Sequence, residues 1–591
     1  MSEPSSESPA SAEKPGLVDR LKDLVTGGSH TDDEPPAGDA QPQDDAGEAQ
    51  EAQPDEGGAA ASEDGSDQGS DDAEQHSDLE TDEEGEPSVG AMPDADEVDV
   101  EEIEEERERR LDPDNLRRRR DVTRGGSAGS RRGRRRSLVD HPLASAPAGA
   151  AAPPPGVRCE DAGVSESAPP RDLRTDVLVV GAGPAGSAAA AWAARAGLDV
   201  VLADAAVFPR DKTCGDGLTP RAVAELGRLG LEDWVRSHTV NRGLRAHGFG
   251  RTLHLRWPGG SLPDWGSAVP RTELDAHLRD AALAAGARAA DGARAVDVRL
   301  EGDRVAAVVF RAGGAGSRET YEIACDRLVV ADGVRSGLGK ALGREWHRDT
   351  VYGVAGRSYL RSQRAADPWI SSHLELRGED GEILSGYGWI FPLGDAEGEG
   401  SGMVNLGVGT LATAKRPADV ALRPLMAHYA EQRRAEFGLE GELQAPTSAL
   451  LPMGGAVSGV AGPNWVLVGD AAACVNPLNG EGIDYGLETG RWAAELLAAE
   501  GTGSYADAWP ALLGQHYAES FSIARRLAGL VTVPRLLPAL GPVGMRSTWM
   551  MTLALRWMGN LVTDEDRDAA ARVWRWAGRR SVALDHRPPF A

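Results

Sequence analysis

The sequence contains few cysteines, and none of them has the spacing of a metal site. The four cysteines are spread over 591 residues without a CxxC pair or a Cys/His cluster: Cys159, Cys214, Cys325 and Cys474. This scarcity argues against a disulfide framework and against a structural zinc site, so no metal is expected. The first residues also lack the pattern of a signal peptide, which predicts a cytoplasmic protein.

Long hydrophobic runs are missing as well. A membrane-spanning helix needs roughly 20 consecutive apolar residues. The two longest candidate segments, 530–545 and 548–562, are interrupted by Arg535 and Arg556. No transmembrane helix is therefore expected, and residues 501–591 are expected to form shorter helices rich in Leu, Met and Trp.

Most of the charge lies outside the expected folded part. Residues 1–106 hold 36 acidic and 3 basic side chains, and residues 107–136 hold 13 arginines and 4 acids. Because residues 1–170 contain few apolar side chains, we expect a disordered acidic and then Arg-rich tail, or a translation start that lies downstream of it. The arginines lack interleaved aromatic residues, which favours neutralisation of the acidic run over specific binding of nucleic acid or anionic lipid.

Residues 175–204 carry the most informative pattern, TDVLVVGAGPAGSAAAAWAARAGLDVVLAD. Two apolar runs flank a Gly-rich turn and an Ala-rich helix, which together predict a βαβ unit. Gly181 allows the tight turn, Gly183 lets a pyrophosphate approach, and Gly186 lets the helix pack on the strand. Asp204 ends the second run, where it is placed to bind a ribose. The whole turn is a candidate dinucleotide site: Gly181, Ala182, Gly183, Pro184, Ala185 and Gly186.

Three later motifs follow the βαβ unit in a fixed order. They comprise Asp332 and Gly333 after one strand, Gly469 and Asp470 after another, and the loop residues Pro477, Gly480, Gly482 and Ile483. In this order they resemble the FAD-binding motifs of p-hydroxybenzoate-hydroxylase-like flavoproteins. The resemblance implies that Asp470 meets the ribityl and pyrophosphate region and that residues 477–483 run beside the isoalloxazine. It also implies that Arg271, in the string PRTELD, contacts FAD.

The implied fold is α/β, a three-layer Rossmann-like FAD-binding fold with an inserted antiparallel β-sheet substrate domain and C-terminal helices. The nucleotide domain is expected to be built from three separated segments. After the tail at 1–170, we expect FAD-binding segments at 171–240, 268–345 and 450–500, substrate-sheet segments at 241–267 and 346–449, and the helical region at 501–591.

Two further strings narrow the family. FPRDKTCGDG at 208–217 and YGWIFP at 387–392 resemble signatures of the geranylgeranyl reductases, which saturate double bonds in polyprenyl chains. The resemblance covers residue 171 onward and implies that Cys214, Gly215, Asp216 and Gly217 lie by the flavin. The fuller strings CGDGLTPRAV and GYGWIFPLG are most similar to the branch that reduces one isoprene unit of a menaquinone tail.

Three side chains are candidates for the chemistry. Tyr387, Trp389 and Phe391 alternate along one strand and so share a face, which either lines a tunnel for the prenyl tail or forms the core of the substrate domain. Tyr387, Trp389 and Cys214 are the candidate catalytic residues. Cys214 is a proton donor, an electron relay or a small packing group, whereas packing is favoured for Cys474.

The favoured function is therefore an FAD-dependent reductase of a polyprenyl chain, with NAD(P)H or a ferredoxin as electron donor. Reduction of geranylgeranyl diphosphate or another prenyl lipid is one alternative. A flavin monooxygenase is disfavoured because Ala473 stands where hydroxylases commonly have His. An interaction protein with a vestigial flavin fold is the last alternative. The helices around Trp549 either cap the tunnel or bind peripherally to the cytoplasmic membrane, which is favoured because menaquinone stays there.

Overall fold

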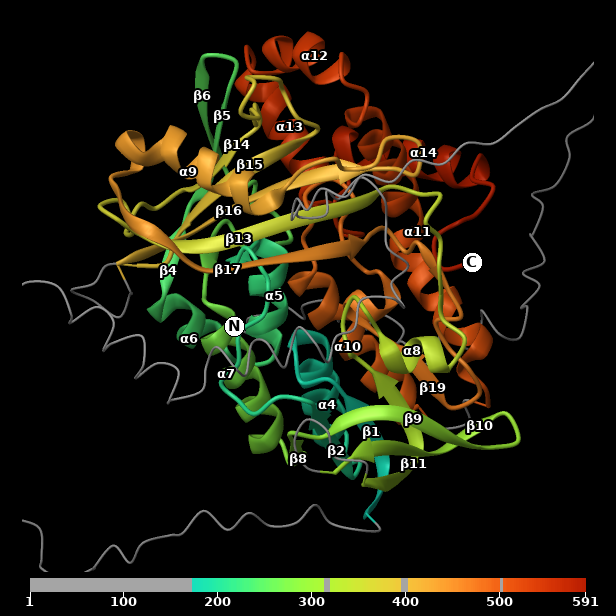
Figure 1. Ribbon diagram of the computed structural model, residues 1–591. Coiled ribbons are helices and arrows are strands. Elements are labelled where there is room, and N and C mark those ends of the chain that lie inside the picture. The colour runs from blue at the N-terminus through green and yellow to red at the C-terminus, as the bar shows by residue number, and fades with distance from the viewer. Residues whose placement is uncertain (1–172, 313–318, 395–401, 500–502) are drawn as a thin grey trace, which may run out of the picture. The chain divides into compact units, whose positions relative to one another are not determined.

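The computed structural model describes residues 173–312, 319–394, 402–499 and 503–591 (Figure 1). The expected tail at 1–170 lies outside these residues. The described chain contains two large β-sheets, two small ones and a set of C-terminal helices.

The first large sheet carries the Gly-rich turn. Its core is parallel, because β1 pairs in parallel with β2 and β11, β2 with β8, and β11 with β19. An antiparallel extension, β10 and β9, is added next to β11. The strands are β8 (Arg288–Asp291), β2 (Val200–Asp204), β1 (Leu173–Val180), β11 (Thr320–Val330), β19 (Trp465–Leu467), β10 (Arg304–Arg311) and β9 (Arg294–Glu301).

Helices α4 (Pro184–Arg195), α7 (Arg271–Ala284) and α10 (Ile483–Ala498) pack together beside this sheet (Figure 1). The close approach of α10 to α4 depends on glycine. A Cβ atom at Gly490 would lie 2.3 Å from the carbonyl oxygen of Ala185. The Ala-rich sequence of α4 provides the matching small surface, and this packing brings the start of α10 next to the Gly-rich turn.

The second large sheet has seven strands, in the order β17, β13, β16, β15, β14, β5 and β6. The expected antiparallel sheet needs one correction, because β14 and β5 pair in parallel. The β5–β6 hairpin comes from an earlier chain segment and forms one edge of the sheet. The strands are β17 (Leu439–Pro452), β13 (Tyr352–Ser362), β16 (Met403–Ala412), β15 (Gly386–Pro392), β14 (Ile370–His373), β5 (Gly243–Gly248) and β6 (Arg251–Arg256).

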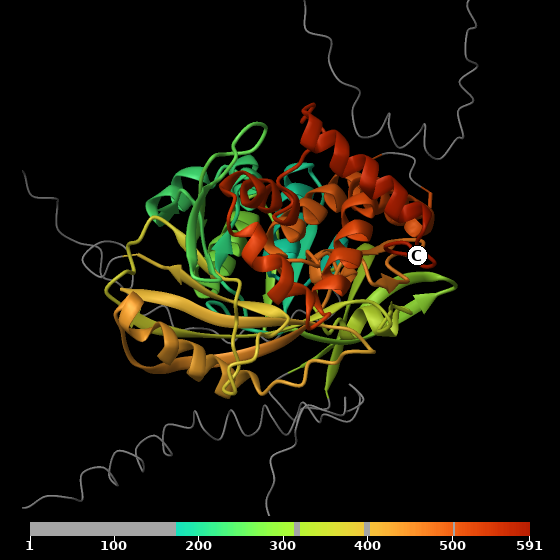
Figure 2. The ribbon, with the colours of Figure 1, turned by 90° about the horizontal axis from the view of Figure 1, so that it is seen from above.

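Helix α9 (Leu422–Phe437) covers one face of this sheet. Tyr429 packs so tightly on β15 that a Cβ atom at Gly388 would lie 2.5 Å from its ring. The opposite face is turned toward the first large sheet (Figure 2), and Trp389 on this face packs against Gly215. The site described below lies between this face and the parallel sheet.

Shorter elements complete the described chain. β3 (Gly217–Leu218), β7 (Gly266–Ala268) and β4 (Thr239–Asn241) form a three-stranded sheet, and β12 (Glu345–Trp346) pairs with β18 (Val457–Ser458). The remaining helical elements are α5 (Pro220–Arg228), α6 (Glu232–Ser237), α8 (Gly337–Ala341) and the 3-10 turn η1 (Gly469–Ala472).

The C-terminal region is helical, as expected, with α11 (Tyr505–Val531), α12 (Leu536–Gly544), α13 (Thr548–Met558) and α14 (Ala569–Ala583). Neither α12 nor α13 contains a buried residue, although both are largely apolar. None of the described helices alone is long and apolar enough to cross a membrane. Only the pair α11 and α12 passes that test together, and it is bent by 111°.

Candidate functional site: a Gly-rich turn beside an aromatic face

Two glycines of the Gly-rich turn lie so close to neighbouring backbone that no side chain would fit there. Gly181 has φ +102°, and a Cβ atom there would lie 2.2 Å from the carbonyl oxygen of Ala331. A Cβ atom at Gly186 would lie 1.7 Å from the carbonyl oxygen of Gly181. Pro184 begins α4, where its missing N–H removes no intrahelical bond, and Ala182 is buried within the turn.

Gly183 is different, because a Cβ atom there would face two guanidinium groups. The nearest atoms would be Nη2 of Arg210 at 3.6 Å and Nη2 of Arg271 at 3.8 Å. Two cations next to a bare backbone and a helix N-terminus form a cradle suited to a pyrophosphate. The residues present therefore fit the phosphates of FAD.

Both arginines are positioned by a buried acid on α7. Asp275 accepts bonds from Nε and Nη2 of Arg271, each at 2.7 Å, and from Nη1 of Arg210 at 2.9 Å. Arg271, a candidate from the sequence, thus lies at the cradle. Arg210 was missed in the sequence, although it lies within the family string at 208–217.

Asp204 lies at the end of β2, as its place in the sequence predicts. Its Oδ2 accepts the backbone N–H of Ala182 at 2.7 Å and its Oδ1 accepts that of Ala206 at 2.8 Å. The side chain therefore tethers the Gly-rich turn to the second strand. Its binding to a ribose stays a prediction.

The two later acidic motifs meet at Lys212. A Cβ atom at Gly333 would lie 3.9 Å from Nζ of Lys212, and the Asp470 charge acts on the same ammonium group. Asp332 accepts the backbone N–H of Leu338 at 2.9 Å. Burial lowers the pKa of Lys212, an effect that Asp470 opposes. Lys212 was not a candidate from the sequence, yet it connects the cysteine segment to both motifs.

The loop after η1 leads to the start of α10. Gly469 has φ +57° and lies against Ala185, and Gly480 has φ +76° within a tight turn. A Cβ atom at Gly482 would lie 3.0 Å from Oδ1 of Asp470. Ile483 is the first residue of α10, and Pro477 lines a small cavity under the C-terminal helices with Tyr485, Phe521, Trp557 and Trp574.

The aromatic residues of β15 do share one face. The ring centroids of Tyr387 and Trp389 are 5.9 Å apart, and those of Trp389 and Phe391 are 6.3 Å apart. A Cβ atom at Gly215 would lie 3.3 Å from both the Trp389 and the Phe391 rings. This face therefore packs on the segment that holds Cys214. The Tyr387 hydroxyl donates to the carbonyl oxygen of Asn479, so it also joins the loop before α10.

A polar network fixes the cysteine segment on the sheet. Asn405 accepts from Nε1 of Trp389 at 2.9 Å and donates to the Cys214 carbonyl at 2.9 Å and to Oδ2 of Asp216 at 2.8 Å. The Tyr359 hydroxyl donates to the same Asp216 oxygen at 2.8 Å. Asn405 and Tyr359 come from β16 and β13, and nothing in their local sequence indicated this role.

The two cysteines of the site are neutral thiols. Burial raises the pKa of Cys214, although the nearby Arg271 guanidinium opposes this. Burial also raises the pKa of Cys474, which is 0% exposed and lies among small residues. Small-residue packing explains Cys474, and the role of Cys214 stays a prediction.

One group in the described chain offers side chains of the metal-ligand type: His247, His373 and Glu436. The two imidazole rings are stacked 4.4 Å apart at 13°, so their in-plane lone pairs run nearly parallel and do not converge on one ion. The Tyr429 hydroxyl bonds to Nδ1 of His373. Burial lowers the pKa of both histidines. This group is best understood as packing between α9 and the sheet.

Asp216 makes stability depend on pH in a predictable direction. It is 0% exposed, and burial raises its pKa to about 6, although bonds from Asn405 and Tyr359 oppose the rise. The folded protein then binds more protons than the unfolded chain between about pH 4 and 6, so this group lowers stability as pH rises through that range. Asp216→Asn should raise the free energy of unfolding by about 2–3 kcal/mol at pH 8 and leave it nearly unchanged below pH 4.

Urea unfolding midpoints at the two pH values test this expectation. Asp297→Asn, at an exposed position of β9, is the control and should change the midpoint at neither pH. An equal effect of Asp216→Asn at both pH values would show that folding does not raise the pKa of this carboxyl.

Comparison with known proteins agrees with this geometry. An FAD binding domain model matches residues 174–381. Menaquinone reductases of Mycolicibacterium smegmatis and Mycobacterium tuberculosis are 62% and 59% identical, covering 71% of this chain and 100% and 99% of theirs. A digeranylgeranylglycerophospholipid reductase of Methanopyrus kandleri is 28% identical over 61% of this chain and 91% of its own.

Solved structures share the fold. A geranylgeranyl bacteriochlorophyll reductase-like protein of Thermoplasma acidophilum superposes with a TM-score of 0.52 at 21% identity, covering 70% of this chain and 97% of its own. A flavin-dependent brominase gives a TM-score of 0.52 at 18% identity, covering 70% of this chain and all of its own. The identity over whole relatives, together with the cradle for a pyrophosphate, shows that this chain belongs to the menaquinone reductases within the geranylgeranyl reductase family of FAD-dependent oxidoreductases.

Proposed function

We propose that this protein saturates one isoprene unit in the tail of menaquinone. The observation that carries the proposal is the 62% identity over the full length of a menaquinone reductase. Archaeal prenyl-lipid reductases are only 28% identical, so a quinone substrate is favoured over a phospholipid. NAD(P)H or a reduced ferredoxin is the two-electron source.

Reduced FAD, when bound, supplies a hydride for one carbon of the double bond. The chain's own residues do the rest. Arg210, Arg271 and the bare backbone at Gly183 would hold the phosphates, and Lys212 lies near Asp470 and both arginines. The face of Tyr387 and Trp389 provides an apolar wall that excludes water, which suits a substrate without hydrogen-bonding groups.

Quinone mass spectrometry tests the proposal. Wild-type protein with reductant should add two daltons to menaquinone, and deletion of the gene should remove the dihydro form from the membranes. An unchanged quinone pool would contradict the proposal, and oxygen consumption with hydroxylated product would favour a monooxygenase.

We further propose that the protein binds peripherally to the cytoplasmic membrane through α12 and α13. Half of the exposed large apolar side chains in the described part of the chain lie between residues 527 and 558. Trp549 is 73% exposed, whereas Met551 and Leu555 on the other side of α13 pack against the β5–β6 hairpin. The exposed Arg535 and Arg546 flank α12, where their positive charges would favour contact with anionic lipid headgroups.

Trp549→Glu should weaken binding to vesicles of anionic phospholipid by about tenfold or more, because it puts a negative charge where an exposed apolar side chain would enter the bilayer. Flotation of the protein with vesicles measures this. Leu300→Glu, at a 52% exposed position on β9, is the matched control and should leave binding unchanged. Equal loss of vesicle binding in both variants would show that an added negative charge weakens binding wherever it is placed.

A further inference from the structure

Glu481 lies where three segments of the site meet. It precedes Gly482, whose Cβ position is 3.0 Å from Oδ1 of Asp470. The Thr219 side chain, at the end of the cysteine segment, hydrogen-bonds to its carboxyl. Tyr387, on the aromatic face, is close enough for the Glu481 charge to act on its hydroxyl. The carboxyl therefore lies between the Asp470 motif and the aromatic face.

The loop around Glu481 is held by its own backbone bonds. The Glu481 N–H donates to Oδ1 of Asn479 at 3.0 Å, and the Glu481 carbonyl accepts the N–H of Asn476 at 2.8 Å. The Tyr387 hydroxyl donates to the Asn479 carbonyl on the same loop. The side chain is thus presented from a fixed backbone.

Neither Glu481 nor its neighbour Asp484 has a counter-ion of its own. Oε2 of Glu481 and both carboxylate oxygens of Asp484 are shielded from solvent and have no hydrogen-bond partner in the described chain. The nearest cation, Arg221, is already bound to Oε1 of Glu488 at 2.8 Å and to the carbonyls of Asn560 and Val562 at 2.9 and 3.2 Å.

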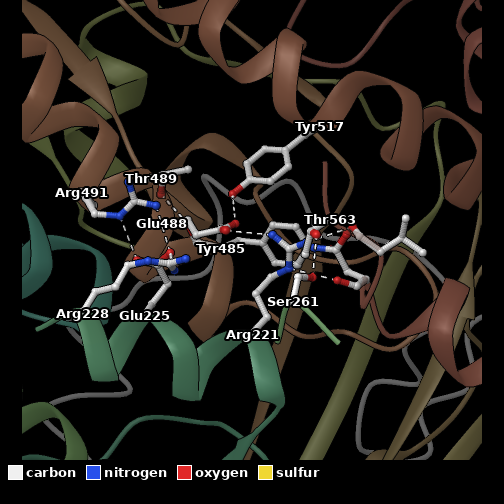
Figure 3. Close-up of polar contacts among 12 residues, drawn as sticks. Arg221, Glu225, Arg228, Ser261, Tyr485, Glu488, Thr489, Arg491, Tyr517 and Thr563 are labelled. Carbon is white, nitrogen blue, oxygen red and sulfur yellow. Dashed lines mark hydrogen bonds and ion pairs between the residues drawn. The ribbon is translucent and has the colours of Figure 1, made fainter. Parts of the chain in front are cut away.

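Figure 3 shows the polar contacts of Glu488. Its second oxygen accepts the Tyr517 hydroxyl at 2.8 Å, so Arg221, Glu488 and Tyr517 form a closed unit beside α10. The carboxyls of Glu481 and Asp484 thus lie near one cation, Arg221, whose charge is already neutralised by the Glu488 carboxylate. Keeping both ionised would place uncompensated negative charge in a shielded site, and one of the pair keeps a proton instead.

The pKa values of both acids agree with this arrangement. Burial raises the pKa of Glu481 well above its usual range, and the Asp484 charge raises it further, while Asn479, Arg221 and Thr219 oppose the rise. Burial raises the pKa of Asp484 to about 7, with Arg221 opposing and Glu488 adding to the rise. Their other titratable neighbours, Tyr485 and Tyr517, have pKa values raised by burial and are neutral.

Two other acids of the site have different surroundings. Asp216 receives bonds from Tyr359 and Asn405 on Oδ2, which oppose the rise of its pKa, while its Oδ1 is shielded from solvent and has no partner in the described chain. Cys214 is a thiol beside the Arg271 guanidinium, held among the arginines that fit the phosphates. Glu481 differs from both in its place, because it stands on the loop before α10 and its charge acts on the Tyr387 hydroxyl of the aromatic face.

We propose that Glu481 is the proton donor of the reduction, an assignment that rests on the proposed function. The alkene carbon that does not receive the hydride takes the proton, so the O–H bond of Glu481 breaks as the C–H bond forms. The hydride supplies both electrons of the other new C–H bond, and the carboxylate left behind is protonated again by water. Charge and hydrogen balance, and no further oxidant or reductant is needed.

Glu481→Gln in the FAD-loaded protein tests this role. Turnover of menaquinone should fall by about 10²–10⁴-fold, the usual contribution of a general acid, while FAD stays bound. The infrared C=O band of a protonated carboxylic acid, measured without substrate, should be present in the wild type and lost in the variant. Glu495→Gln, on α10 and paired with Arg491, is the control and should change neither.

A second variant keeps the test independent of how well Glu481→Gln folds. Asp484→Asn removes a repelling charge, so the alkaline fall in rate should move to lower pH. An active Glu481→Gln, or an unchanged infrared band, beside a wild type that converts menaquinone would overturn the donor role alone. A wild type that does not convert menaquinone would overturn the proposed function, and the donor role with it.

Discussion

Replacement of Gly186 with alanine should give a colourless protein. The new methyl group would lie 1.7 Å from the carbonyl oxygen of Gly181 and 3.0 Å from Cβ of Ala331, both on rigid backbone. The start of α4 must move away from the Gly-rich turn, which removes the N–H groups from the phosphate position. We expect FAD retention to fall at least about 100-fold, equivalent to roughly 3 kcal/mol.

Absorbance of the flavin per mole of purified protein measures the effect, and equilibrium dialysis gives the affinity. Gly514→Ala is a matched control, because it is also a Gly to Ala change within a helix but has no atom within 4 Å of its Cβ position. It should keep FAD and gain up to about 1 kcal/mol of stability. A yellow Gly186→Ala protein with unchanged affinity would show that the turn does not hold the cofactor.

Arg271→Met should both weaken FAD binding and destabilise the protein. Arg271 is 6% exposed and makes two 2.7 Å bonds to Asp275, which is 0% exposed. Removing one partner of such a buried pair typically costs about 3–5 kcal/mol, because the remaining charge is uncompensated. The bond from Arg210 to Asp275 reduces this loss and places the expected value near the lower end.

The stability of apoprotein and the FAD content separate the two effects. Arg279→Met lies two turns further along α7, where it pairs with Asp291 and Asp280 near the surface. It should cost about 1 kcal/mol or less and keep FAD. If Arg271→Met loses stability but binds FAD as the wild type does, Arg271 serves only to neutralise Asp275.

Much of the nucleotide-binding part could be predicted from the sequence because its signals are local. The turn, the helix and both strands of residues 173–204 follow one another without interruption, and each glycine has a steric reason that can be stated in advance. The alternation of Tyr387, Trp389 and Phe391 likewise fixed their common face through the two-residue period of a strand.

The residues that sequence reasoning missed act across long separations. Asn405 reaches Asp216 over 189 positions, and Tyr359 reaches it over 143. Arg210 and Lys212 stand in an irregular segment, where no periodicity indicates the direction of a side chain. The parallel pairing of β14 with β5 also depends on how distant segments meet, and the local pattern of either strand is equally compatible with an antiparallel neighbour.

The end of α13 is tied to the loop around Glu481 by one bond, and the residues just after it are held by α5. Nδ2 of Asn476 donates to the carbonyl of Met558 at 2.8 Å, and Arg221 holds the carbonyl of Asn560. If α13 rests on lipid, these bonds set the depth of the loop relative to the bilayer surface. The height of the loop above the bilayer would then determine which double bond of the isoprenoid chain reaches it. A longer tail would leave the reduced position unchanged.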